Sequence, residues 1–175
     1  MSFSTTKLPT FLITDLFKKV LISSTNNNLP APENMEFEEI RKPLEFLGEN
    51  KKGIAIVIND ANAVYITDDK LQLLTNLLLA CNLSIADVAI INIANKNINF
   101  TTLKTSLNIE YLLMMGIDIQ AFELPLIFSK NKVQHFDKIS LLITENLSVL
   151  IGNSNEVKNE KRALWNALKL MFNIK

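Results

Sequence analysis

The residues of this 175-residue chain best placed for acid-base chemistry stand just after short stretches that are almost entirely apolar. Asp60 follows the stretch 54–58, and Glu145 follows the stretch 139–143. If both stretches are parallel strands, their carboxyl ends meet at the edge where open α/β sheets bind ligands. Asp60 and Glu145 would form a pair able to activate a water molecule there. Asp and Asn are also ordinary turn and cap residues, so a structural role stays open. If the chain is an enzyme, the catalytic candidates are Asp60, Thr144 and Asn146.

Other reactive side chains are few, since the chain holds one histidine, His135, and one cysteine, Cys81. One histidine and one cysteine cannot build a zinc cage, a disulfide framework or an iron-sulfur site within one chain. No strand-end carboxylate lies near His135 to orient it, and Cys81 falls on the apolar face of a predicted helix. The four glycines are all at least five residues apart, which excludes a phosphate-binding glycine loop. We therefore expect no metal and no cofactor.

The elements that must position these candidates follow from the apolar pattern. Strands buried on both faces are apolar in both alternations, and the sequence has four nearly continuous apolar stretches, at 54–58, 88–93, 111–115 and 139–143. Helical spacing is found at 68–81, at 102–107 and in the last segment, where Trp165 is predicted to anchor the helix to the core. The expected fold class is therefore α/β, with three layers (αβα) and a central, mainly parallel four-stranded sheet.

A hairpin is predicted between the third and fourth stretches. Residues 125–128 and 132–136 are short and apolar enough to pair around Ser129-Lys130-Asn131. His135 would lie in this hairpin, away from the strand ends where a ligand is expected. We therefore expect a structural role for this side chain.

Residues 1–43 differ from the domain that we expect at 44–175. Apolar residues at helical spacing predict one amphipathic helix, and the polar stretch 23–32, with two prolines, predicts a linker. A helix of about ten residues is marginal alone in water, so its apolar face must bury either on this domain or on a partner. The partner-binding candidates are Phe11, Leu12, Leu16, Phe17, Val20 and Leu21.

The composition excludes several classes of protein. Hydrophobic residues make up 48% of the chain, which is typical of a globular core and excludes disorder throughout. The 18 basic and 18 acidic side chains give no net charge, which argues against a protein that grips nucleic acid mainly by its phosphates. No apolar segment reaches ~18 residues and the N-terminus lacks a signal-peptide pattern, so we expect a cytoplasmic protein without membrane contact.

Three stretches, taken in order, resemble the uracil-DNA glycosylase fold. Residues 53–88 are similar to its first strand, connecting loop, helix and the start of its second strand. Residues 111–117 look like the glycosylase strand that ends in glycine, and residues 146–169 look like its closing segment, with a basic, apolar and Trp-containing helix. The resemblance covers about residues 46–172. Within this fold the chain is closest in character to the psi subunits of bacterial DNA polymerase III.

The chain departs from the glycosylases at the positions that carry their chemistry. The resemblance implies a His-Pro-Ser loop after the fourth strand, where this sequence reads Thr144-Glu145-Asn146. The loop after the first strand keeps only Asp60 of the water-activating pattern, and Tyr65 is the one aromatic residue nearby that could contact a flipped base. The chain therefore resembles the fold without the enzyme, as the psi subunits do.

The resemblance implies a non-catalytic DNA-replication accessory protein that bridges the clamp loader and other replisome proteins. The N-terminal segment would be the clamp-loader contact, and any DNA contact would be weak. Two alternatives stay open. One is a divergent uracil-DNA glycosylase-family enzyme of base-excision repair that uses Asp60. The other is an α/β protein that keeps this fold for an unrelated interaction.

Overall fold

The computed structural model describes residues 44–94, 96, 98–120, 122–124 and 129–174. The predicted N-terminal helix with its six partner-binding candidates, the linker and the hairpin segment 125–128 lie outside the described residues. The strands and helices at 54–58 and beyond can be compared with the predictions directly.

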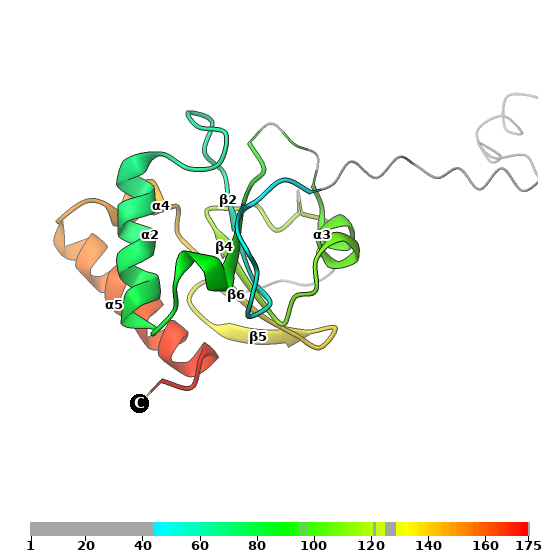
Figure 1. Cartoon of the computed structure of the whole chain (residues 1–175). Coiled ribbons are helices and arrows are strands. Elements are labelled where there is room, and N and C mark those ends of the chain that lie inside the picture. The colour runs from blue at the N-terminus through cyan, green and yellow to red at the C-terminus, as the bar shows by residue number, and fades with distance from the viewer. Residues whose placement is uncertain (1–43, 95, 97, 121, 125–128, 175) are drawn as a thin grey trace, which may run out of the picture. The chain divides into compact units, whose positions relative to one another are not determined.

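The core is a six-stranded sheet with the order β1-β3-β2-β4-β6-β5 (Figure 1). The four inner strands pair in parallel, and both outer pairs are antiparallel. The prediction of a four-stranded sheet is therefore wrong in number: the four predicted strands form the centre of a mixed sheet, and two short edge strands complete it. The strands are β1 (Leu47–Gly48), β2 (Ile54–Ile58), β3 (Val88–Asn92), β4 (Tyr111–Met115), β5 (Val133–Phe136) and β6 (Ile139–Thr144).

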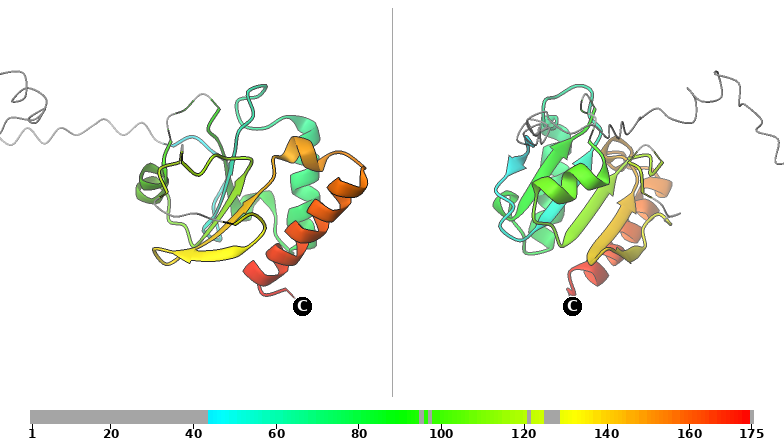
Figure 2. Two further views of the ribbon diagram at one scale, coloured as in Figure 1. Left: turned by 180° about the vertical axis from the view of Figure 1, so that it is seen from behind. Right: turned by 90° about the vertical axis from the view of Figure 1, so that its right-hand side faces the viewer.

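Helices cover both faces of this sheet (Figures 1 and 2). On one face, α2, α4 and α5 pack against an apolar cluster that includes Ile54, Ile56 and Ile58. On the other face, α3 packs against a second cluster that includes Ala55 and Val57. Successive residues of β2 thus alternate between two cores, as expected of a strand buried on both faces. The helices are α2 (Asp68–Ala80), the 3₁₀ helix η1 (Ile85–Asp87), α3 (Phe100–Ser106), α4 (Leu147–Leu150) and α5 (Asn155–Met171).

Strand β5 has a different described partner from the one that the sequence predicts. It pairs with β6 through the two-residue turn Asp137-Lys138, and His135 lies opposite Ser140. Both turn residues have positive φ, 51° and 67°, which is the geometry of a type I′ turn. This turn favours Asn-Gly, so Asp-Lys gave no sequence signal for the hairpin.

The helices predicted at 68–81, at 102–107 and in the last segment are confirmed, with small shifts of their ends. The helix α2 ends at Ala80, with Cys81 as its C-cap, and α3 begins two residues earlier than predicted. Among the described helices, none combines the length and the apolar character needed to cross a membrane.

Candidate functional site

Asp60 lies two residues beyond β2 at the carboxyl edge of the sheet, and its residue is only 1% exposed. Its Oδ1 lies 2.9 Å from Lys70 Nζ in the first turn of α2 and accepts a 3.3 Å hydrogen bond from Asn62 N–H. Its Oδ2 accepts hydrogen bonds from the backbone N–H and the hydroxyl of Thr67, both at 3.0 Å. A carboxylate has about four acceptor sites, and protein donors occupy all of them here. No acceptor site remains for a water molecule or a substrate.

The electrostatic state of Asp60 agrees with this structural role. Burial raises the pKa of Asp60, but hydrogen bonds from Lys70, Thr67 and Asn62 lower it more, and the resulting pKa is about 2. The carboxylate is therefore ionised at neutral pH and paired with Lys70, whose side chain is only 12% exposed. A general base works best with a pKa near the operating pH, so a pKa of about 2 suits Asp60 poorly to that task.

Asn92, the last residue of β3, completes the network around Asp60 and is 4% exposed. Its Oδ1 accepts hydrogen bonds from Asp60 N–H at 3.0 Å and from Ala94 N–H at 3.1 Å. Its Nδ2 donates to the carbonyl oxygens of Asp60, Ala63 and Val64, at 2.7, 2.8 and 3.3 Å. Two buried side chains, Asp60 within the loop after β2 and Asn92 at the end of β3, thus fix the conformation of the loop 59–67. Asn92 is not among the candidates that the sequence predicts, although a lone amide near the end of an apolar stretch is a usable signal.

Asp60 and Glu145 do not form the acid-base pair that the sequence allowed. Strand β4 lies between β2 and β6, so the strand ends that precede Asp60 and Glu145 lie roughly 10 Å apart at a strand spacing of about 4.8 Å. Asp60 is paired with Lys70, and Glu145 forms an ion pair with Lys130 on the surface. The two carboxylates therefore have separate partners on different elements.

Thr144 and Asn146, the other two catalytic candidates, sit at the end of β6 and at the start of α4. Thr144 is 2% exposed, and its hydroxyl has no hydrogen-bond partner among the described residues. Asn146 caps α4, because its Oδ1 accepts a 2.9 Å hydrogen bond from Ser148 N–H. The structure thus gives Asn146 a cap role and places Thr144 in the interior beside the core.

Gly116 makes a close backbone contact with Asn146 at this edge. It follows β4 with a φ of 67°, and a Cβ atom there would lie 2.6 Å from Asn146 Cβ and 2.8 Å from Asn146 Cα. We expect Gly116→Ala to lower the free energy of unfolding by about 2–4 kcal/mol, because both the left-handed backbone and the clash are unfavourable. Urea denaturation measures this loss. Gly152→Ala is the matched control, since the nearest atoms to its Cβ would be Val157 Cγ2 at 3.4 Å and Val149 O at 3.7 Å. Equal losses for the two variants would contradict the expectation.

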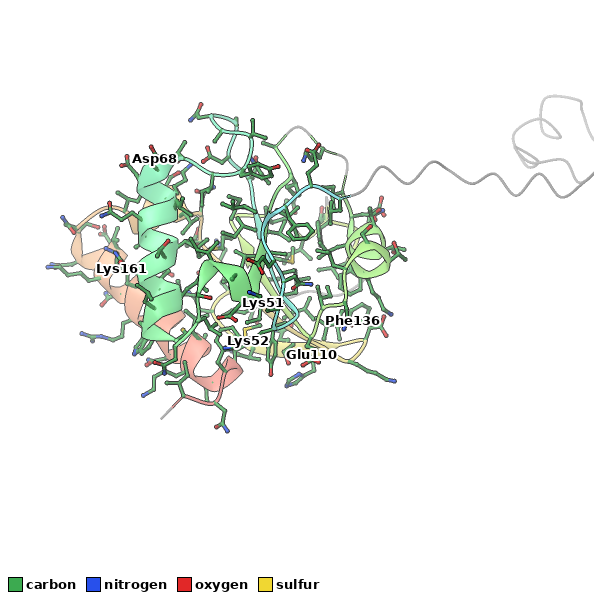
Figure 3. The ribbon with its side chains drawn as sticks, viewed as in Figure 1. Lys51, Lys52, Asp68, Glu110, Phe136 and Lys161 are labelled. Atoms are coloured by element: carbon green, nitrogen blue, oxygen red, sulfur yellow. The ribbon has the colours of Figure 1, made fainter. Side chains whose placement is uncertain are left out.

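The carboxyl edge is acidic in the part of the chain that the structure describes. Asp68 marks this edge at the start of α2, whereas Lys51, Lys52 and Glu110 lie at the opposite edge (Figure 3). The described loops after the parallel strands, with the first turn of α2, carry six carboxylates and four lysines: Asp60, Asp68, Asp69, Asp118, Glu123 and Glu145, with Lys70, Lys96, Lys130 and Lys132. Such an edge repels a phosphate backbone rather than attracting it.

The remaining candidates pack or pair in ordinary ways. His135 is exposed on β5, where its Nδ1 lies 3.2 Å from Ser140 Oγ. Cys81 is buried, and burial raises the pKa of its thiol, which disfavours the nucleophilic thiolate. Trp165 and Tyr65 are partly buried against the apolar cluster beneath α2 and α5, so Trp165 anchors the last helix as predicted.

Neither a metal centre nor a relative points to an activity. Within the described ranges, no three or more His, Cys, Asp or Glu side chains gather in a way that could hold a metal ion. No protein-family model matches the sequence, and no curated protein matches it either.

Proposed function

We propose that this protein is a non-catalytic DNA-replication accessory protein, similar to the psi subunits of DNA polymerase III, that bridges the clamp loader and other replisome proteins. One observation carries the non-catalytic part: the Asp60 carboxylate accepts from Lys70, Thr67 and Asn62 and has no acceptor site left for a water molecule. The replisome part rests on the ordered resemblance of residues 46–172 to that fold and those subunits.

The charge of the carboxyl edge supports a protein partner over a DNA substrate. An enzyme that flips a base must hold the phosphates on both sides of it, which requires basic groups around the site. Here the exposed first turn of α2 carries Asp68 and Asp69, and Asp118 and Glu123 follow β4. These acidic groups would raise the free energy of a bound duplex.

The partner contact is assigned to the N-terminal segment. Its six apolar candidates, Phe11 to Leu21, follow helical spacing and precede a polar linker with two prolines. Helix-in-groove recognition uses apolar residues at this spacing, and a linker lets such a segment reach a partner's groove.

Capture of clamp-loader subunits from the same organism tests this assignment. Full-length protein with Leu12→Asp and Leu16→Asp should lose at least about tenfold in affinity, because two charges would enter an apolar groove. Ser23→Asp with Ser24→Asp is the matched control: it adds the same two charges in the predicted linker and should bind like the wild type. Equal binding by all three proteins would contradict the assignment of the partner contact to the N-terminal segment.

A second assay, for the release of a base from DNA, distinguishes a glycosylase from the proposed non-catalytic protein. A divergent glycosylase would release base from a uracil-containing or damaged oligonucleotide, and Asp60→Asn would abolish that release. We expect no base release from the wild type even at high enzyme concentration, since the only buried carboxylate at the described carboxyl edge is occupied. Release that depends on Asp60 would overturn the non-catalytic proposal.

A further inference from the structure

A cleft opens at the edge of the sheet opposite Asp60. It lies at the amino ends of β2 and β4, where the C-terminal ends of α2 and α5 approach each other (Figure 1). Its volume is about 640 Å³. Sites for small molecules have volumes of roughly 300–1,000 Å³, so the cleft has the size of such a site.

The floor of the cleft is apolar and continues into the interior. Ile54 and Cys81 line the cleft, together with Phe172, and the same three side chains line a narrow apolar gap beneath it. That gap runs between the sheet and the helices α2 and α5, and its lining includes Leu78 and Leu168. Ile54 and Cys81 are only 2% and 6% exposed, so the apolar part of a ligand would contact chiefly the half-buried rings of Tyr111 and Phe172.

One wall of the cleft is aromatic. The rings of Tyr111 and Phe172 lie 5.3 Å apart between centroids and are tilted by 49°. Both residues line the cleft. A pair of rings in this arrangement offers a flat, weakly hydrated surface to an aromatic or aliphatic group.

The rim supplies a cation and two amides. Lys52 lines the cleft with a side chain that is 52% exposed, and its Nζ forms a long ion pair with Asp87 Oδ2 at 3.7 Å. Asp87 Oδ2 already accepts hydrogen bonds from Ser84 N–H and Oγ–H, at 2.8 and 2.9 Å. The Lys52 ammonium group has three N–H donors, so it can also donate to an anion in the cleft while it stays near Asp87. Asn82 and Asn173 place two further side-chain donors on the rim.

We propose that this cleft binds a small amphipathic carboxylate. The carboxylate of the ligand pairs with Lys52, and its apolar part lies on Tyr111 and Phe172 and points toward Cys81. This site is separate from the N-terminal segment that carries the proposed function, so either assignment can fail without the other.

Cys81 makes the proposal measurable, because it is the sole cysteine of the chain and lines the cleft. In the full-length protein, saturating 2-naphthoate should slow the labelling of Cys81 by a thiol reagent at least about fivefold, since the occupied site is both covered and stabilised. The neutral analogue 2-naphthalenemethanol should protect at least about tenfold more weakly at equal concentration, because it lacks the charge that pairs with Lys52.

A matched pair of lysine variants tests whether Lys52, on the rim, binds the carboxylate of the ligand. Lys52→Gln should weaken 2-naphthoate binding about tenfold. Lys51→Gln should leave it unchanged, since Lys51 does not line the cleft and pairs with Glu49 at 2.7 Å. The backbone amide resonances of Asn82 and Phe172, followed by NMR in the same titration, decide the result if labelling is too slow to measure. Unshifted resonances without protection, or equal losses in the two variants, would overturn the proposal.

Discussion

Asp60→Ala is expected to lower the free energy of unfolding by about 3–5 kcal/mol at neutral pH, the usual cost of removing one partner of a buried ion pair. Lys70, whose side chain is 12% exposed, would keep its charge without a counterion. The loop 59–67 would also lose the hydrogen bonds that Asn62 and Thr67 donate to the carboxylate. Urea denaturation followed by circular dichroism measures the loss.

Two further variants separate the contribution of the Asp60–Lys70 ion pair from the effect of removing any carboxylate near the start of α2. Asp69→Ala removes an exposed carboxylate from the same helix end and should cost no more than about 1 kcal/mol. Adding Lys70→Met to Asp60→Ala removes the unpaired charge and should restore part of the stability. A loss for Asp60→Ala no larger than that of Asp69→Ala would show that the buried pair contributes little.

The same carboxylate makes the stability of the protein depend on pH. The folded-state pKa of Asp60, about 2, lies below its ordinary value of 3.8. A group with a lowered folded-state pKa stabilises the fold fully above its unfolded-state pKa, and the contribution is lost as the pH falls through the folded-state pKa. The difference between wild type and Asp60→Ala should therefore shrink by about 2 kcal/mol between about pH 5 and pH 2. A difference that stays constant across this window would contradict the ionic role.

Asn92→Leu is expected to lower the free energy of unfolding by about 2–4 kcal/mol, because a buried amide that makes several hydrogen bonds is replaced by an apolar side chain of similar size. The backbone N–H groups of Asp60 and Ala94 would lose their acceptor. The carbonyl of Asp60 would lose its donor inside the fold.

Hydrogen exchange shows where this loss occurs. The backbone amides of Asp60 and Thr67 should exchange at least about tenfold faster in Asn92→Leu, since the loop 59–67 would open locally. Asn76→Leu makes the same substitution at an exposed position of α2 and should leave these amides unchanged. Unchanged exchange in Asn92→Leu would mean that other contacts hold the loop.

The central strands were predictable because each of them is marked by a nearly continuous run of apolar residues within the strand itself. Strands β2 and β4 coincide with the predicted stretches 54–58 and 111–115, and both are buried at nearly every position. A residue in a central parallel strand contacts a helical layer on one face or the other, so every position is apolar. This information is carried by the strand itself and needs no knowledge of its neighbours.

The edges of the sheet were not predictable in the same way. Strand β1 has two residues, and its pairing with β3 joins positions that are more than 40 residues apart. Strand β5 was predicted as a strand, but its pairing with β6 depends on the turn Asp137-Lys138, which lacks the Asn-Gly signal. Short edge strands bury little apolar surface, so their residue pattern does not indicate which strand they pair with.

At the carboxyl edge of the sheet, the sequence and the tertiary structure determine different things about Asp60. The sequence alone determined that Asp60 follows a buried strand and therefore lies at the edge where α/β sheets place ligands. Only the tertiary structure decided what Asp60 does, because Lys70 and Thr67 at the start of α2 and Asn92 from β3 surround it. The reactivity of a carboxylate depends on its burial and on the donors that reach its oxygens, and distant parts of the chain supply both.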